Sequence, residues 1–113
     1  DQSRFEDLSG GLRLSAGQPL LVTLPPGAES GDEAVTHGGQ ELLFCLEGTL
    51  VCQVGETRYP LESGDSLLYE AHLPHRWQNA GAQACRFLLL LYTGSGEAPR
   101  REAPLPAPEG DSR

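Results

Sequence analysis

Short apolar runs alternate with turn signals through the middle of the chain. Short apolar runs bounded by turn residues are typical of β-strands. No run keeps the period of about 3.6 residues that marks an amphipathic helix. The pattern predicts seven strands, at residues 19–24, 41–46, 49–54, 57–61, 66–69, 75–79 and 84–92.

Turn signals between these runs indicate how the strands connect. Residues 47–48 and 55–56 are compact enough for hairpin turns, and residues 63–65 form a third turn signal. Hairpin connections make neighbouring strands antiparallel. Seven short strands at this spacing predict an all-β sandwich or barrel, and closure of a barrel removes exposed strand edges.

The two ends of the chain differ from this middle. Residues 1–10 form a polar N-terminal segment, and residues 93–113 carry four prolines among charges and glycines, which predicts a flexible tail. The remaining residues, 11–92, suit a single domain with one core. No segment approaches the roughly 20 apolar residues of a membrane span, and none is typical of a signal peptide. We therefore expect a soluble protein with no membrane partner.

The charge balance limits the chemistry of the chain. Its formal net charge is -8, which argues against direct nucleic-acid binding because phosphate contacts need a basic face. All eight basic residues are arginine, so Schiff-base lysine chemistry is excluded. The chain has no methionine, even as an initiator. We interpret it as one domain of a longer protein, in which any DNA binding belongs to a separate N-terminal domain.

Three cysteines, Cys45, Cys52 and Cys85, each lie within an apolar run. An odd number of cysteines in apolar strands indicates reduced core thiols of a cytoplasmic protein. A soft-metal or nucleophilic role remains the alternative, because Cys45 shares the strand parity of Glu41 and can line the same cavity.

Two clusters carry the candidate chemistry. The first is His37-Gly-Gly-Gln-Glu41, and the second runs from Pro74-His75 to Asn79. Residues four apart on a strand project from the same face, so His37 and Glu41 can face one cavity. Glu41 precedes an apolar run, where a buried carboxylate is costly unless it is paired or bound to metal. Two imidazoles and one carboxylate can share a divalent metal.

Together these clusters resemble the two motifs of the cupin superfamily of small β-barrel proteins, over residues 25–91. The residues that match the motifs are Gly31, His37, Glu41, Gly48, Gly64, His75 and Asn79. The departures are Val35 for the first histidine of the first motif, and Glu70 and His72 for a proline and a glycine of the second. The resemblance implies an all-β, cupin-type barrel of antiparallel, jelly-roll-like topology.

The resemblance also implies a metal site. Its ligands would be His37, Glu41 and His75, with His72 or water in the position that Val35 vacates, and the metal would be Fe, Zn, Ni, Mn or Co. A ligand pocket would include Cys45, Trp77 and Asn79. Plainer roles stay open: a surface position for His37, His72 or His75, and a backbone cap for Asn79.

Three functions are compatible with these features. The chain resembles the C-terminal sensor domain of helix-turn-helix (XRE-type) transcription regulators, which implies a small-molecule effector and a homodimer. The alternative is a stand-alone metal-dependent enzyme, such as a dioxygenase or an isomerase. A metal-free dimerisation module is the third. No additional acid-base pair is evident near the proposed ligands, so we expect a sensor rather than an enzyme.

Overall fold

The structure, a computed structural model, describes residues 3–12, 17–30 and 38–92. Within these ranges the chain forms eight strands and no helix, and every strand pair is antiparallel. The strands are β1 (Arg4–Asp7), β2 (Gly17–Leu24), β3 (Gln40–Glu47), β4 (Thr49–Val54), β5 (Thr57–Glu62), β6 (Ser66–Glu70), β7 (His75–Gln78) and β8 (Cys85–Tyr92). All seven predicted strands are confirmed, each within two residues at either end.

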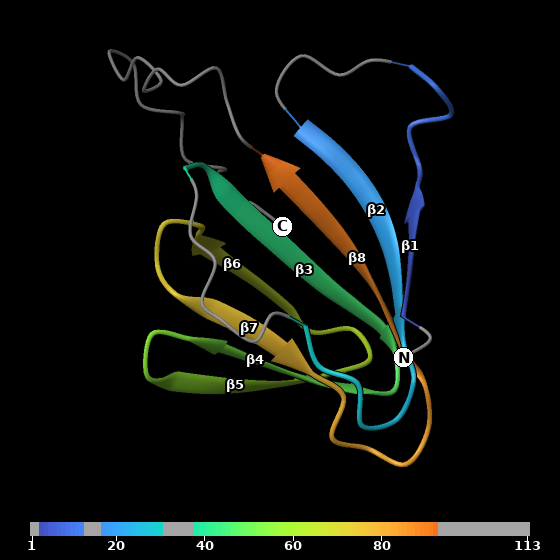
Figure 1. Cartoon of the computed structure of the whole chain (residues 1–113), viewed down its shortest axis with the longest axis vertical. Helices are drawn as coiled ribbons and strands as arrows, with labels where there is room; N and C mark the ends of the chain where they lie inside the picture. Colours follow the sequence, from blue (N-terminus) through green and yellow to red (C-terminus); the bar gives the residue numbers. More distant parts are fainter. Residues whose placement is uncertain (1–2, 13–16, 31–37, 93–113) are drawn as a thin grey trace, which may run out of the picture.

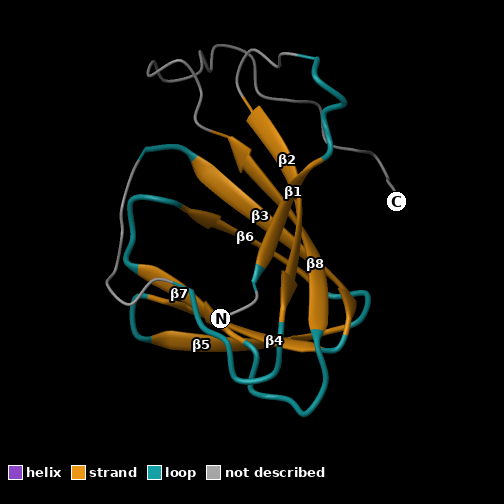
Figure 2. Cartoon of the chain, turned by 45° about the vertical axis from the view of Figure 1, so that its right-hand side comes forward, coloured by secondary structure: helices purple, strands orange, loops and turns teal. Residues whose placement is uncertain are grey.

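Two sheets face each other (Figures 1 and 2). The larger sheet has the strand order β1-β2-β8-β3-β6, and the smaller has the order β5-β4-β7. Sequence neighbours β3 and β4 lie in different sheets, whereas β3 pairs with β8 from the far end of the domain. This crossing between sheets is jelly-roll-like, and the predicted all-β, antiparallel fold is confirmed.

Strand β1 was not predicted, and it lies in the segment that we expected to be only polar. Charged residues interrupt its alternation, and all four of its residues are exposed. Pairing with β2 nevertheless places Phe5 opposite Val22, and the Leu8 amide donates to the Pro19 carbonyl at 2.9 Å. The Phe5 ring also lies 6.2 Å from the Trp77 ring, between centroids. The N-terminal segment therefore adds an edge strand to the sheet.

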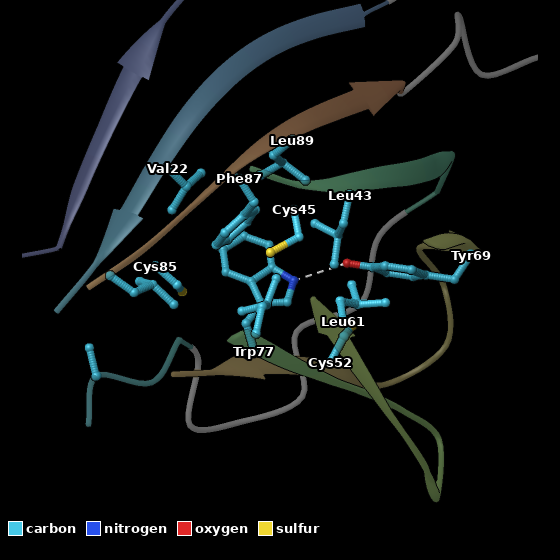
Figure 3. Packing of buried hydrophobic residues seen from close by; sticks show 13 residues of the cluster. Val22, Leu43, Cys45, Cys52, Leu61, Tyr69, Trp77, Cys85, Phe87 and Leu89 are labelled. Carbon is cyan, nitrogen blue, oxygen red and sulfur yellow. Dashed lines mark hydrogen bonds between the residues drawn. The ribbon is translucent and has the colours of Figure 1, made fainter. Parts of the chain in front are cut away.

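The core lies between the two sheets and consists of the inward-facing residues of both (Figure 3). Leu43 and Phe87 from the larger sheet and Leu50 from the smaller are fully buried. The Phe87 and Trp77 rings meet edge to face, at 5.3 Å between centroids and 78°. Full burial of one such side chain contributes roughly 1.5–3 kcal/mol.

No helix in the described ranges has the length and apolarity needed to span a membrane.

Gly48, in the turn between β3 and β4, is required by its backbone and by its surroundings. Its φ is +81°, a left-handed conformation that other residues adopt only with strain. A Cβ at this position would lie 2.8 Å from the Cys85 Cβ and 2.9 Å from the Ala84 carbonyl oxygen. The close approach of two backbones at this corner therefore needs glycine.

We expect Gly48→Ala to lower the free energy of unfolding by about 2–4 kcal/mol, because conformational strain adds to a clash with backbone atoms. Gly55→Ala is the matched control: its φ is +62°, but no atom lies within 4 Å of the added Cβ. The control should lose only about 1–2 kcal/mol. Urea denaturation of both variants measures the difference. Equal losses in the two variants would show that the close approach of Cys85 adds nothing to the cost of backbone strain at Gly48.

Candidate functional site

The candidate site lies where β3 and β7 begin and β6 ends, on the left in Figure 1. Glu41 is the second residue of β3, His75 is the first residue of β7, and Tyr69 is opposite Glu41 in the β3–β6 register. The alternation of the strands points Glu41 and Tyr69 inward, and both are buried. Three strands from two sheets thus bring three polar side chains to one end of the core.

Glu41 is a buried carboxylate with defined partners. Only 3% of the residue is exposed. The Tyr69 hydroxyl donates to Glu41 Oε1, and His75 Nε2 lies 3.4 Å from Glu41 Oε2. The Trp77 indole Nε1 in turn donates to the Tyr69 hydroxyl at 3.1 Å (Figure 3). A buried charge of this kind is tolerated because hydrogen bonds and an opposite charge or cation compensate its desolvation.

The tautomer of His75 follows from its second nitrogen. His75 Nδ1 lies 2.7 Å from the Leu73 carbonyl oxygen. A carbonyl oxygen only accepts hydrogen bonds, so Nδ1 carries a proton. In a neutral ring, the lone pair of Nε2 then points toward the Glu41 carboxylate. At 3.4 Å from Glu41 Oε2, His75 Nε2 can share a proton with the carboxyl group, or the two atoms can bind one cation.

Tyr69 is the site residue that the sequence analysis missed. Burial, the neighbouring Cys52 and the Glu41 carboxylate raise its pKa well above the ordinary value, so the phenol stays protonated and remains a hydrogen-bond donor. Its ring also lies 5.1 Å from the His75 ring, between centroids. The sequence gives only a weak indication of this role. Tyr69 shares the inward face of Leu67 in a predicted strand, but nothing in the sequence shows that it lies opposite Glu41.

The three cysteines are free and fully buried. Burial raises the pKa of the Cys52 thiol to about 12 and that of Cys85 to about 11, and burial together with Asp65 raises that of Cys45. A reactive cysteine has the opposite property, a lowered pKa in an accessible position. The geometry therefore supports core thiols rather than a nucleophile.

These shifted thiols predict a loss of stability at high pH. A folded pKa above the unfolded value of 9.0 gives a stabilisation that is complete below pH 9 and is lost as the pH rises through about 11 for Cys85 and about 12 for Cys52. Between its unfolded and folded pKa, each thiol lowers the free energy of unfolding by up to about 1.4 kcal/mol per pH unit. Cys52→Ala should reduce the slope of unfolding free energy against pH above 9, measured by urea denaturation. An unchanged slope would contradict the burial of this thiol.

The predicted pocket residues occupy different environments. Cys45 is on the same face of β3 as Glu41, as its parity predicts, but its thiol lies 3.5 Å from the Gly48 carbonyl oxygen at the other end of the strand. Trp77 is 7% exposed and extends the Glu41–Tyr69 network. His72 is exposed in the turn between β6 and β7. The Trp77 side chain is therefore the predicted pocket residue that hydrogen bonds connect to the site.

Asn79 is fully buried, and its side chain makes three hydrogen bonds to backbone atoms. Its Nδ2 donates to the carbonyl oxygens of Leu24 and Gln83, at 2.9 and 2.8 Å, and its Oδ1 accepts from the Gly81 amide at 2.9 Å. These bonds join the end of β2 to the loop between β7 and β8. The geometry thus supports the backbone role that the sequence left open for Asn79.

His37, the third predicted metal ligand, and Val35 lie outside the described residues. Within the described ranges, no three side chains of histidine, cysteine, aspartate or glutamate gather closely enough to hold a metal ion. Of the predicted ligands, the structure therefore brings together Glu41 and His75. Two glycines, Gly38 and Gly39, directly precede β3, and Gly39 has a φ of +97°.

Comparison with known proteins identifies the family. The model of the cupin domain (Cupin_2) matches residues 20–91, more than half of the chain. The chain belongs to the cupin family. The match covers β3 to β7 and most of β2 and β8, and it includes Glu41, Tyr69 and His75.

Two of the proteins that are similar to this chain are a transcription regulator and a domain of one. The cupin domain is 33% identical over 69 residues to the HTH-type transcriptional regulator PuuR of Escherichia coli (strain K12). This match covers 61% of the chain but only 37% of the regulator, so the chain spans little more than a third of that relative's length. A solved Cupin_2 domain of an XRE family transcriptional regulator from Enterobacter cloacae has the same fold, with a TM-score of 0.72 at 19% identity, over 87% of this chain and 98% of that one.

An enzyme of the same superfamily is also similar. The sugar phosphate isomerase from a cupin superfamily of Silicibacter pomeroyi has a TM-score of 0.69 and 26% identity, over 80% of this chain and 59% of that one.

Proposed function

We propose that this cupin domain is the effector-binding domain of a transcription regulator, and that it binds a small molecule at the end of the barrel marked by Glu41 and His75. The observation that supports this most strongly is the buried carboxylate–imidazole pair, because a soluble domain seldom buries such a pair without a use for it. DNA binding would belong to a separate N-terminal domain. The 33% identity to PuuR supports this arrangement.

We propose that the same pair binds a divalent metal together with His37. The chemistry of the donors fits: His75 donates Nδ1–H to a backbone carbonyl, which is how metal-ligating histidines are commonly held, and its Nε2 faces a carboxylate oxygen. Tyr69 would fix the second carboxylate oxygen of Glu41. A metal bound there would act as a Lewis acid that attracts oxygen or nitrogen atoms of an effector. Fe, Zn, Ni, Mn and Co all suit these donors.

A metal-dependent enzyme is the second candidate, favoured by the 26% identity to the sugar phosphate isomerase. Proton transfer would then need a group that changes protonation near neutral pH. Tyr69 does not suit this role, because its pKa is raised far above neutrality. Its hydroxyl is also enclosed between Trp77 and Glu41. Tyr69 is therefore better suited to holding Glu41 in place than to exchanging protons with a ligand.

A thermal-shift screen of small metabolites, with and without added metal, tests the proposed function. A ligand at a hundredfold excess over its dissociation constant should stabilise the domain by about 2.7 kcal/mol. Each hit is then incubated with the metal-loaded domain and its concentration is followed. The sensor predicts a stable ligand concentration. The enzyme predicts steady consumption.

We also propose that the domain forms a homodimer through the outer face of the larger sheet. In the strand registers, Leu88 of β8 lies between Leu21 and Phe44, and Leu90 lies between Pro19 and Leu42. Leu68 continues the second row on β6 and is 59% exposed. Five strands of up to eight residues span roughly 19 by 27 Å. This flat area of about 500 Å² is smaller than the roughly 800 Å² that each partner of a standard interface buries, so the dimer would be of the small, weaker kind.

We expect Leu90→Glu to shift the sedimentation mass from dimer to monomer, because a charge at the centre of the face would have to be buried without a partner. Leu73→Glu is the matched control, since Leu73 is similarly exposed, 38% against 39%, but lies in a turn outside the sheet. It should leave the dimer intact. A wild-type monomer, or equal effects of the two variants, would contradict a dimer through this face.

A further inference from the structure

The outer face of the smaller sheet carries a row of polar side chains that the site described above does not use. Gln53 of β4 is paired with Arg58 of β5 on one side and with Arg76 of β7 on the other. Their sequence neighbours Cys52 and Trp77 point into the core, so these three side chains point outward. Three adjacent strands thus align two guanidinium groups on either side of an amide.

This row borders a depression in the surface. Its walls are Glu29, Val51, Gln53, Arg58, Arg76 and Gln78, and it encloses about 320 Å³ when the open solvent above it is included. A second depression, of about 230 Å³ on the same measure, shares Gln53 and Arg76 and extends to Gly55, Pro74 and His75. The two depressions adjoin, because they share these two residues, and we call them together the groove. Apart from Gly55, the lining of the groove is polar except for Val51 and Pro74.

The charges in this groove favour an anion at one end. Neighbouring strands are about 4.8 Å apart, so the Cα atoms of Arg58 and Arg76 are roughly 10 Å apart. Two long arginine side chains at that separation can converge on one small anion. Glu29 also lines the depression, but it accepts a hydrogen bond from Gln78 Nε2 at 3.5 Å. Gln78 pairs with Val51, so the acidic group lies beside this neighbouring pair rather than beside the arginines.

Two further observations support a ligand beside Arg58. Among the described residues, the Arg58 guanidinium has no ion pair or hydrogen bond, whereas Arg86 on β8 pairs with Glu47 at 3.3 Å. The chain has only eight basic residues against sixteen acidic ones, so two aligned arginines make a local exception to an acidic molecule. Guanidinium groups bind the two oxygens of a carboxylate or phosphate in a fork.

We propose that this groove is a second binding site, on the outside of the barrel, for a small oxyanion: the phosphate or carboxylate group of a metabolite. Arg58 and Arg76 would each donate to the anion from opposite sides, with Gln53 between them. The anion position between Arg58 and Arg76 is separate from the buried Glu41 and needs no metal, although the groove also borders His75. Binding of an anion there is therefore independent of the proposed function.

Titration of the ¹⁵N-labelled protein with inorganic phosphate, at constant ionic strength, tests this site. We expect saturable shifts of the amide signals of Gln53, Arg58 and Arg76, with a dissociation constant below about 10 mM. Succinate in a parallel titration distinguishes a carboxylate from a phosphate preference. Saturable shifts with either anion at these residues support the site. Shifts that grow linearly or appear elsewhere with both anions would overturn it.

Variants make the test quantitative. Arg58→Gln and Arg76→Gln should each weaken binding about tenfold, since each removes one charge-assisted contact. Arg86→Gln is the matched control and should leave the affinity unchanged, because Arg86 is on the other sheet. Equal losses in all three variants would show that net charge alone attracts the anion. The wild-type titration decides the location of binding even if a variant folds poorly.

Discussion

His75→Ala is expected to reduce the affinity of the domain for Zn(II) or Ni(II) by at least a factor of about 100. Loss of a group that merely orients a ligand costs about 10–100-fold, and loss of a ligand itself should cost more. In the structure, His75 presents Nε2 to Glu41 and anchors Nδ1 on the Leu73 carbonyl. Competition with a chromogenic chelator measures the affinity of each variant.

His72→Ala is the matched control for this experiment. His72 is three residues away in the chain but exposed in a turn, so its removal should leave metal affinity within about twofold of wild type. Tyr69→Phe should give an intermediate loss of about 10–100-fold, because it removes the hydroxyl that holds Glu41 Oε1. If His75→Ala binds metal as tightly as the wild type, His75 is not a ligand. If His72→Ala shows the larger loss, the ligand assignment must move to that turn.

Asn79→Ala is expected to lower the free energy of unfolding by about 3–5 kcal/mol, the largest loss from a single polar side chain in the described core. The substitution removes three hydrogen bonds to the backbone and leaves the Leu24 carbonyl buried without this partner. Each buried group left unsatisfied costs about 1–3 kcal/mol. Equilibrium urea denaturation gives the change.

Gln78→Ala, one residue earlier, provides the comparison. The Gln78 side chain points outward and makes one long hydrogen bond to Glu29, so this variant should change stability by no more than about 0.5 kcal/mol. Asn79→Asp should be destabilised like Asn79→Ala, since it keeps the acceptor for Gly81 but turns a carboxylate toward two carbonyl oxygens. Full stability of Asn79→Asp would argue that Asn79 is solvated rather than buried.

Short apolar runs between turn signals were enough to predict seven of the eight strands, because each of the seven contributes at least one buried residue to the core. The strand at residues 49–54 is an instance: Leu50 and Cys52 point inward, and the predicted and observed bounds are identical. Strand β1 escaped prediction because three of its four residues are charged and none is buried, and its place in the sheet depends on pairing with β2 and on the contact of Phe5 with Trp77. Edge strands of this kind carry little signal in their own sequence.

The candidate site was only partly predictable. The polar residue Glu41 within an apolar run indicated a buried group with a partner, and His75 was found through its resemblance to a motif. Tyr69 could not be found in this way, because it meets Glu41 through a register between strands 28 residues apart. The outward row of Arg58, Gln53 and Arg76 depends on the same kind of information. Distances between sheets and registers across strands are set by the whole fold rather than by local sequence.

The most direct test of the proposed function is the fate of a small molecule that binds at Glu41 and His75. A hit from the thermal-shift screen should stabilise the wild-type domain by about 2.7 kcal/mol at a hundredfold excess over its dissociation constant. It should stabilise Glu41→Gln much less, and its concentration should stay constant during incubation with the metal-loaded wild type. Steady consumption of the hit by the wild type would contradict the sensor and favour the enzyme. Equal stabilisation of Glu41→Gln would place the ligand elsewhere.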